Sequence, residues 1–222
     1  MEPLSLRTLK LIWVMPAERV MFSGAQISLY PMADDFVSII LGALHALDPY
    51  RESLRIETDD LSTLMVGPPE ALFPAMRDLF VAAARRGTHC VLSACVSRGC
   101  PGEPDDPACT PLTDLGAIGS LEERIAQAKA AVAASHATGL NVAAQFSHYP
   151  LGVGHHMDEI YGCIEFLKTS GVFDRPKNFC TRLSGDAGPV FGTLEQAFLR
   201  FGAPEGHVAL DVTVSANSPS LG

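Results

Sequence analysis

The sequence predicts an α+β fold made of two consecutive ferredoxin-like βαββαβ units, with antiparallel sheets and with the helices on one face. The first observation behind this prediction is an internal repeat, since Tyr30-Pro31 recurs as Tyr149-Pro150. The second is that both halves contain the same order of segments with strand-like and helix-like hydrophobic periodicity. Further residues recur 118 positions later, namely Thr63 as Thr181, Gly67 as Gly185, Phe73 as Phe191, His89 as His207, Ser97 as Ser215 and Pro101 as Pro219.

The first unit opens with a strand and a helix. Residues 25–31, AQISLYP, alternate apolar and polar side chains, which is typical of a half-buried strand. Residues 33–47 place apolar side chains at helical spacing, and Asp34 or Asp35 is a candidate N-cap. We therefore expect this helix to pack on the sheet.

The rest of the first unit predicts a hairpin, a helix and a strand. Residues 53–67 contain two short strand-like runs around the Asp-rich turn Thr58-Asp59-Asp60. Residues 68–87 predict a helix, because Pro lies in the first turn and Glu70 lies near the positive end of the helix dipole. Residues 88–99 complete the unit as its last strand.

The second unit repeats this order after a long connection. Residues 100–119 are rich in Pro, Gly and Asp and predict a domain boundary, and residues 120–139 predict a connecting helix capped by Ser120. The expected organisation is an N-terminal extension over residues 1–21, a first repeat over 22–98, a linker with a connecting helix over 99–140, and a second repeat over 141–222.

Composition narrows the classes of partner. The formal net charge of -9, without a cluster of Lys and Arg, argues against a nucleic-acid partner. No apolar run approaches the ~18 residues of a membrane span, and the patch in residues 1–21 is too short and too interrupted for a secretory signal. We therefore expect a cytoplasmic protein without membrane insertion.

The cysteines and histidines do not form a recognisable reactive or metal-binding motif. Six cysteines lack C-x-x-C spacing, and Cys90 and Cys95 should point to opposite faces of one strand. We expect reduced and mostly buried thiols, with a bridge between Cys100 and Cys109 as the exception. The pair His155-His156 is interpreted as solvated surface rather than a metal site.

The sequence also lacks the glycine-rich and nucleophile motifs of common enzyme classes, so we predict neither catalysis nor a cofactor.

Two amides mark the open side of the predicted sheets. Gln26 and Gln145 recur in the first strand of each unit, next to Ser28 and Ser147. An amide that faces the helices would be costly unless hydrogen-bonded, so we expect both to face the open side. Helices on one face leave the other face to be covered by the second repeat or a second chain, and ligand sites tend to form at such seams.

Several motifs in the same order resemble the YkoF-like thiamine and hydroxymethylpyrimidine (HMP) binding proteins. They are SLYPMADDF at 28–36, TDDLST at 58–63, SRGCPG at 97–102, LSGDAGPVFGTLEQAF at 183–198 and VSANSPS at 214–220. The resemblance covers roughly residues 22 to 220. It implies tandem ferredoxin-like repeats, a homodimer, and non-catalytic cytoplasmic binding of thiamine or HMP in precursor uptake or salvage.

Such a ligand needs a carboxylate or dipole near its cation, an aromatic face, and short polar groups for the aminopyrimidine. The candidate ligand-binding residues are Gln26, Ser28, Tyr30, Asp34, Thr58, Asp59, Ser62 and Thr63 in the first repeat, and Gln145, Ser147, Tyr149, Cys180, Thr181, Ser184 and Asp186 in the second. Each type also has a structural alternative: the tyrosines can seal the core, Asp34 can cap a helix, Asp59 can form a turn, and Thr is a good strand residue.

The two repeats are not chemically equivalent. At the spacing of 118, Thr58-Asp59 corresponds to Pro176-Lys177, so a base replaces an acid. Two sites should therefore differ in their affinity for a cation. Two other functions stay open from sequence: an enzyme that acts on a related heterocycle, and a regulatory or oligomerisation module without a small ligand.

Overall fold

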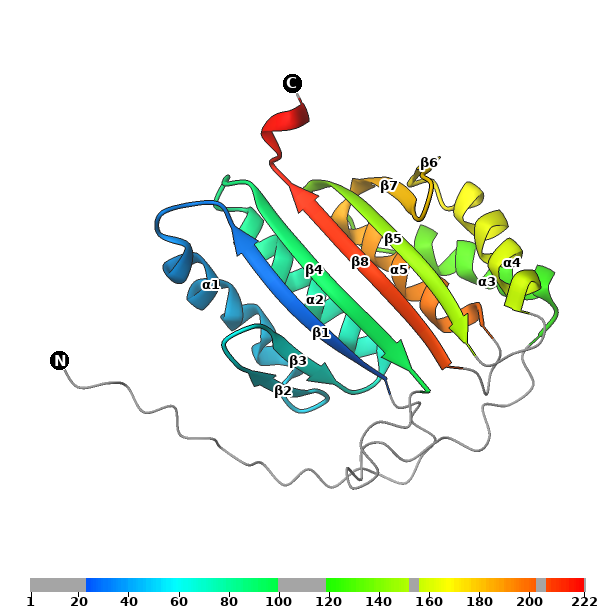
Figure 1. The fold of residues 1–222 in the computed structure, drawn as a ribbon, viewed down its shortest axis with the longest axis horizontal. Helices are drawn as coiled ribbons and strands as arrows, with labels where there is room; N and C mark the ends of the chain where they lie inside the picture. The colour runs from blue at the N-terminus through cyan, green and yellow to red at the C-terminus, as the bar shows by residue number, and fades with distance from the viewer. Residues whose placement is uncertain (1–22, 100–118, 152–155, 203–206, 222) are drawn as a thin grey trace.

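One continuous antiparallel sheet of eight strands runs through both repeats (Figure 1). The structure, a computed structural model, describes residues 23–99, 119–151, 156–202 and 207–221. The strand order is β2-β3-β1-β4-β8-β5-β7-β6, which places the two hairpins at opposite margins. The strands are β1 (Ser23–Pro31), β2 (Arg55–Thr58), β3 (Thr63–Val66), β4 (Cys90–Arg98), β5 (Asn141–Leu151), β6 (Phe173–Pro176), β7 (Thr181–Asp186) and β8 (His207–Ala216).

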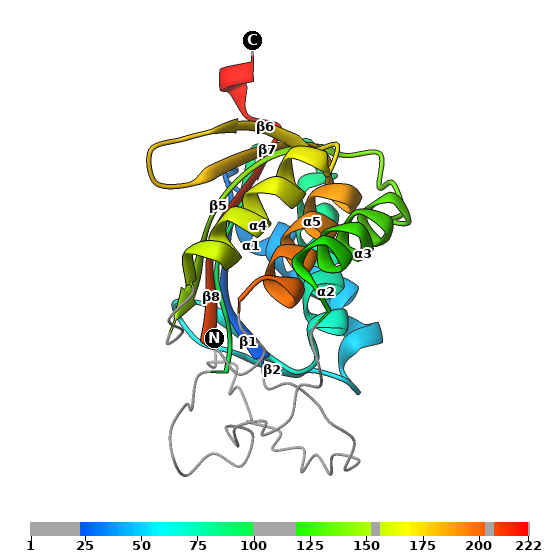
Figure 2. The same cartoon turned by 90° about the vertical axis from the view of Figure 1, so that its right-hand side faces the viewer.

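All five α-helices of the described part lie on one side of this sheet, and the other side is open (Figure 2). They are α1 (Phe36–Leu44), α2 (Pro69–Ala84), α3 (Leu121–Ala133), α4 (His156–Thr169) and α5 (Ala187–Arg200), with short 3₁₀ turns at His45–Tyr50 and Pro219–Leu221. The predicted α+β class with helices on one face is thereby confirmed. No helix in the described ranges combines the length and the apolar character that crossing a membrane requires.

The repeats join through the last strand of each, β4 and β8, in the middle of the sheet. Near one end of this seam, His89 Nε2 lies 3.0 Å from Ser215 Oγ, and near the other end His207 Nε2 lies 2.8 Å from Ser97 Oγ. Each contact takes one residue from each repeat, so the seam has approximate two-fold symmetry. The recurrence of these residues thus has a structural cause.

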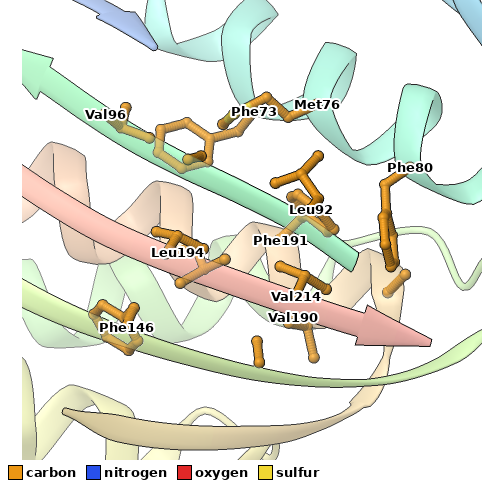
Figure 3. Close-up of a cluster of buried hydrophobic side chains, with 14 of the residues drawn as sticks. Phe73, Met76, Phe80, Leu92, Val96, Phe146, Val190, Phe191, Leu194 and Val214 are labelled. Atoms are coloured by element: carbon orange, nitrogen blue, oxygen red, sulfur yellow. The ribbon is translucent and has the colours of Figure 1, made fainter. Parts of the chain in front are cut away.

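A single core fills the space between the sheet and the helices (Figure 3). The ring centroids of Phe73 in α2 and Phe198 in α5 are 5.4 Å apart, and those of Phe80 and Phe191 are 6.2 Å apart. Aromatic pairs at such distances add about 0.5–1.5 kcal/mol beyond the area that they bury. Because α2 and α5 belong to different repeats, the repeats stabilise each other.

Of the two helix caps predicted from the sequence, one is present in the structure and the other is not. Ser120 forms a full capping box with Glu123 at the start of α3, which confirms the predicted cap. Asp35 occupies the N-cap position of α1, but its side chain makes no capping hydrogen bond, and its carboxylate lies 3.9 Å from Arg86. The capping role expected for Asp34 or Asp35 is therefore wrong for the side chain.

The strand faces agree with the cysteine prediction, since Cys90 is buried and Cys95 is exposed. His156 is exposed, in agreement with the expected solvated surface. The expected bridge between Cys100 and Cys109, and His155, lie outside the described residues.

Candidate ligand-binding site

The open face carries the recurring amides. Gln26 is exposed between buried neighbours in β1, and Gln145 is partly exposed between buried neighbours in β5. Because side chains alternate across a strand, both amides point away from the helices. The prediction that they face the open side is confirmed.

In the first repeat, β1 holds the tip of the β2–β3 hairpin through two side-chain hydrogen bonds. Gln26 Nε2 donates to Ser62 Oγ at 2.5 Å, and Ser28 Oγ donates to the carbonyl oxygen of Leu61 at 3.1 Å. The hairpin tip is thereby fixed beside the open face. The side chain of Leu61, at 80% exposure, has almost no contact with the rest of the described chain.

Asp59 shapes this tip. Its Oδ1 accepts hydrogen bonds from the backbone N–H groups of Leu61 and Ser62, each at 2.8 Å. These two bonds hold the pKa of the Asp59 carboxyl below its ordinary value. The turn-forming role is thus confirmed, and the carboxylate also gives the tip an exposed negative charge.

The second repeat reproduces these contacts with different chemistry. Ser147 Oγ donates to the carbonyl oxygen of Phe179 at 2.8 Å, as Ser28 does in the first repeat. Lys177 Nζ donates to Gln145 Oε1 at 2.6 Å, and Cys180 Sγ lies 3.9 Å from the same oxygen. The two tips are therefore built alike, although they carry opposite charges.

Sequence reasoning missed the two apolar residues at these tips. Leu61 and Phe179 occupy corresponding positions, and Phe179 is 90% exposed. The available signal was a large apolar side chain in turns that otherwise contain Asp, Ser, Lys, Asn and Cys.

The threonines lie on the other face of the sheet. Thr63 pairs with Ile27 and Thr181 pairs with Phe146, and both partners are buried on the helix side. Directly opposed residues point to the same face, so both threonines face the helix layer. Thr58 Oγ1 lies 3.0 Å from Thr63 Oγ1, so Thr58 belongs with this group rather than with the amides.

Each threonine is the last residue of the hairpin that pairs with the first strand of its repeat, and beyond it the outer edge of that strand has no pairing partner among the described strands. Among the described strands, Ser28–Pro31 of β1 pairs only with β4, and Ser147–Leu151 of β5 pairs only with β8. We call these the first and second free-edge segments. Unpaired strand edges present backbone N–H and C=O groups that can hydrogen-bond a ligand. Each repeat therefore places a Thr hydroxyl beside a row of free backbone donors and acceptors.

The remaining candidates lie at different places. Tyr30 and Tyr149 are 53% and 48% exposed, so the alternative that they seal the core is wrong. Asp34 and Ser184 are exposed. Asp186 is the N-cap of α5, at the end of β7 remote from Thr181, and it accepts hydrogen bonds from the backbone N–H groups of Thr138, Gly139 and Gly188 at 2.7–2.8 Å. These bonds give Asp186 a clear structural role.

Arg98 and Arg182 do not offer an exposed cation to the candidate residues. Arg98 is only 1% exposed, and its Nε donates to the carbonyl oxygen of Phe198 at 2.9 Å. Arg182 opposes Gln145 in the sheet and forms an ion pair with Asp174. In the part of the chain that the structure describes, His, Cys, Asp and Glu side chains do not gather into a group of three or more that could hold a metal ion.

These features define a tandem ferredoxin-like protein with one related set of polar groups in each repeat. The YKOF-related family matches residues 22–103 and again residues 141–221, and the chain belongs to this family. A relative from Bacillus subtilis (strain 168) is named "Putative HMP/thiamine-binding protein YkoF". It is 30% identical over 200 residues, which cover 89% of this chain and 92% of the relative.

Proposed function

We propose that this protein binds thiamine or its precursor HMP without chemical conversion, at one site in each repeat, in cytoplasmic precursor uptake or salvage. The observation that carries the proposal is the duplicated arrangement of a threonine and a free strand edge, at Thr63 and at Thr181. The name of the Bacillus subtilis relative supports a binding role for the family.

The chemistry of the two segments suits the aminopyrimidine ring. A flat heterocycle with ring nitrogens and an exocyclic amine needs alternating donors and acceptors along one edge, which the backbone of a free strand provides. The hydroxyls of Thr63 and Thr181 add a donor and acceptor that can rotate. Tyr30 and Tyr149 are exposed on the same strands and offer an aromatic face, although strand alternation places them on the open side of the sheet, opposite to the threonines.

The two sites should prefer different forms of the ligand. The thiazolium of thiamine carries a permanent positive charge, which the exposed carboxylate of Asp59 attracts and the ammonium of Lys177 repels. We therefore expect thiamine to prefer the first repeat, whereas the neutral HMP should discriminate less between repeats.

Calorimetric titration tests this function. The wild-type protein should give saturable heat with thiamine and with HMP, and Thr63→Val and Thr181→Val should each weaken one component. Thr169→Val, at the end of α4 where the hydroxyl bonds to Phe166, is the control and should leave both components unchanged. Absence of heat with both ligands would refute the proposal. Loss of heat in the control as well would refute the assignment to the two segments.

We further propose that the protein is a homodimer whose subunits cover each other's open face. Strand spacing and rise give this face an area of roughly 900 Å², close to the ~800 Å² that each partner contributes to a standard interface. Cys95 is exposed and lies opposite Asp211 at the seam, in the middle of the face. Cys95→Arg should therefore convert the dimer to a monomer in analytical ultracentrifugation.

The control is Ala130→Arg, which adds the same charge on an exposed position of α3. A wild-type monomer, or a Cys95→Arg variant that is as dimeric as the control, would contradict this interface.

A further inference from the structure

A histidine lies at the helix-side surface of the second free-edge segment. His148 is in β5, two residues beyond Phe146, and therefore on the same face as Phe146 and its partner Thr181. Diagonal neighbours of this kind have Cα atoms about 7–8 Å apart. His148 and Thr181 are thus diagonal neighbours on the helix side of the sheet, at the place where the outer edge of β5 loses its pairing partner.

The contacts of His148 fix which ring nitrogen carries the proton. Nε2 lies 3.0 Å from the carbonyl oxygen of Phe201, and because a carbonyl can only accept, Nε2 must donate. Burial lowers the pKa of His148 to about 4, so the ring is neutral near pH 7. Nδ1 is then left with a lone pair that can only accept a hydrogen bond.

That acceptor is buried and unsatisfied. Nδ1 of His148 has no hydrogen-bond partner among the described residues, although it is shielded from solvent. A buried polar atom without a partner costs about 1–3 kcal/mol. Unpaired buried acceptors are rare in folded proteins, which indicates that a donor from outside the chain completes this one.

The first repeat differs at this position. Leu29 is the counterpart of His148, since it also lies one residue before the tyrosine of the Tyr-Pro pair, and it packs against the hydrophobic core. The first repeat therefore accommodates an aliphatic side chain here, and in the second repeat the bond from Nε2 to Phe201 explains only one of the two ring nitrogens. The second repeat holds an oriented acceptor that the first repeat lacks.

The charged residues around His148 favour a neutral group as the external hydrogen-bond donor to Nδ1. Arg98 and Glu159 both act electrostatically on the ring, the first as a cation and the second as an anion. Glu159 itself is held by Arg124, with two hydrogen bonds at 2.7 and 3.0 Å. A ligand ion at Nδ1 would lose its hydration in a region whose charges already have partners, whereas a neutral N–H group would not.

We propose that His148 determines the specificity of the second-repeat site, where its Nδ1 accepts a hydrogen bond from the exocyclic amino group of an aminopyrimidine. The inference rests on the proposed function, because it assigns one contact of that ligand. It also gives the second repeat a selectivity for amino-substituted rings that the first repeat does not share.

A double-mutant cycle between protein and ligand tests the contact. HMP and its analogue without the amino group are titrated into wild-type protein, His148→Leu and His148→Gln, and binding is measured by calorimetry. Glutamine can keep the hydrogen bond to Phe201 through its Nε2, but its acceptor Oε1 lies on the same terminal amide and not at the position of Nδ1. It therefore tests whether the acceptor must be at Nδ1. His136→Leu, at an exposed position before β5, is the matched control.

We expect the second-repeat component of HMP binding to weaken about ten- to hundredfold in both His148 variants, and the first-repeat component to stay unchanged. The analogue should bind the wild type and the variants with the same weak affinity at the second repeat. In ¹⁵N spectra of labelled wild-type protein, HMP should move the Nδ1 resonance of His148, and the analogue should not.

Three results would overturn the inference. HMP binding that is equal in the wild type and in His148→Leu would exclude the contact, and the function would still stand. Normal binding by His148→Gln would show that binding does not need an acceptor at the position of Nδ1. Absence of HMP binding by the wild type would remove the proposed function and this inference together, so the two failures are distinguishable.

Discussion

Replacing Glu195 by glutamine should reveal a strong pH dependence of stability that the wild-type protein conceals. Glu195 lies in α5, where burial and the neighbouring carboxylate of Glu70 raise its pKa from 4.5 to about 7, against the opposing effect of Arg77 and Arg200. His148 is shifted in the opposite sense, since burial lowers its pKa from 6.5 to about 4. The two groups titrate in overlapping ranges of pH.

Their effects on the free energy of unfolding have opposite signs. Between pH 4.5 and 7 the native protein keeps a proton on Glu195 that the unfolded chain releases, so stability falls as the pH rises. Between pH 4 and 6.5 the unfolded chain binds a proton on His148 that the native protein does not, so stability rises with pH. Each group contributes about 1.4 kcal/mol per pH unit inside its window, and the two slopes cancel where the windows overlap.

Urea unfolding between pH 5 and 6.5 measures how the free energy of unfolding changes with pH in the wild type and in Glu195→Gln. The wild type should show a nearly constant free energy of unfolding, whereas Glu195→Gln should gain about 2 kcal/mol across this range, because only the histidine slope is left. Acidic groups with lowered pKa, such as Asp59, Asp186 and Glu159, titrate below this window and do not interfere.

The control is Glu122→Gln, at an exposed position of α3, which should keep the flat wild-type profile. Parallel profiles for the wild type and Glu195→Gln would refute the reasoning, since they would mean that the pKa of Glu195 is not raised to this extent.

Three further changes test the packing. Phe73→Ala should lower the free energy of unfolding by about 3–5 kcal/mol in urea titrations, because it leaves a cavity against Phe198, and a loss below 1 kcal/mol would exclude the shared core. Ser120→Ala should cost about 1 kcal/mol through loss of the capping box, and an unchanged urea midpoint would contradict that role. Phe179→Ser should leave the thermal midpoint unchanged, because the side chain is 90% exposed, and a marked decrease would show a packing role.

The element order could be predicted from sequence because each element has a strong local signal. Hydrophobic alternation located β1, and the N-cap candidate Ser120 located the start of α3. Which candidate ligand-binding residues face the helices and which face the open side of the sheet could not be predicted in the same way. Thr63 faces the helices because the hairpin register sets it opposite Ile27, and a shift of one residue would turn it to the open face.

Two residues carried signals that were not used. Asp186 directly precedes the α5 segment, which is the ordinary position of an N-cap, and the structure shows it capping that helix. His148 follows Phe146 by two residues, so strand alternation alone places it on the helix side. By contrast, the tautomer that leaves Nδ1 as an acceptor is set by the contact of Nε2 with Phe201, which is 53 positions away in sequence, and no local pattern could reveal it.

Some residues are the same in both repeats and others differ, and the contacts across the β4–β8 seam explain this difference. The His89–Ser215 and Ser97–His207 contacts each need one residue from either repeat, so a change in one repeat breaks a contact with the other. Among the described residues, the hydrogen bonds of the hairpin tips stay within their own repeat, and those from Ser28 and Ser147 go to backbone carbonyl groups, which any residue at the tip can provide. Side chains at the tips could therefore diverge without cost to the fold. Duplication in this geometry keeps the shared sheet constant while it allows two sites with different ligand preferences.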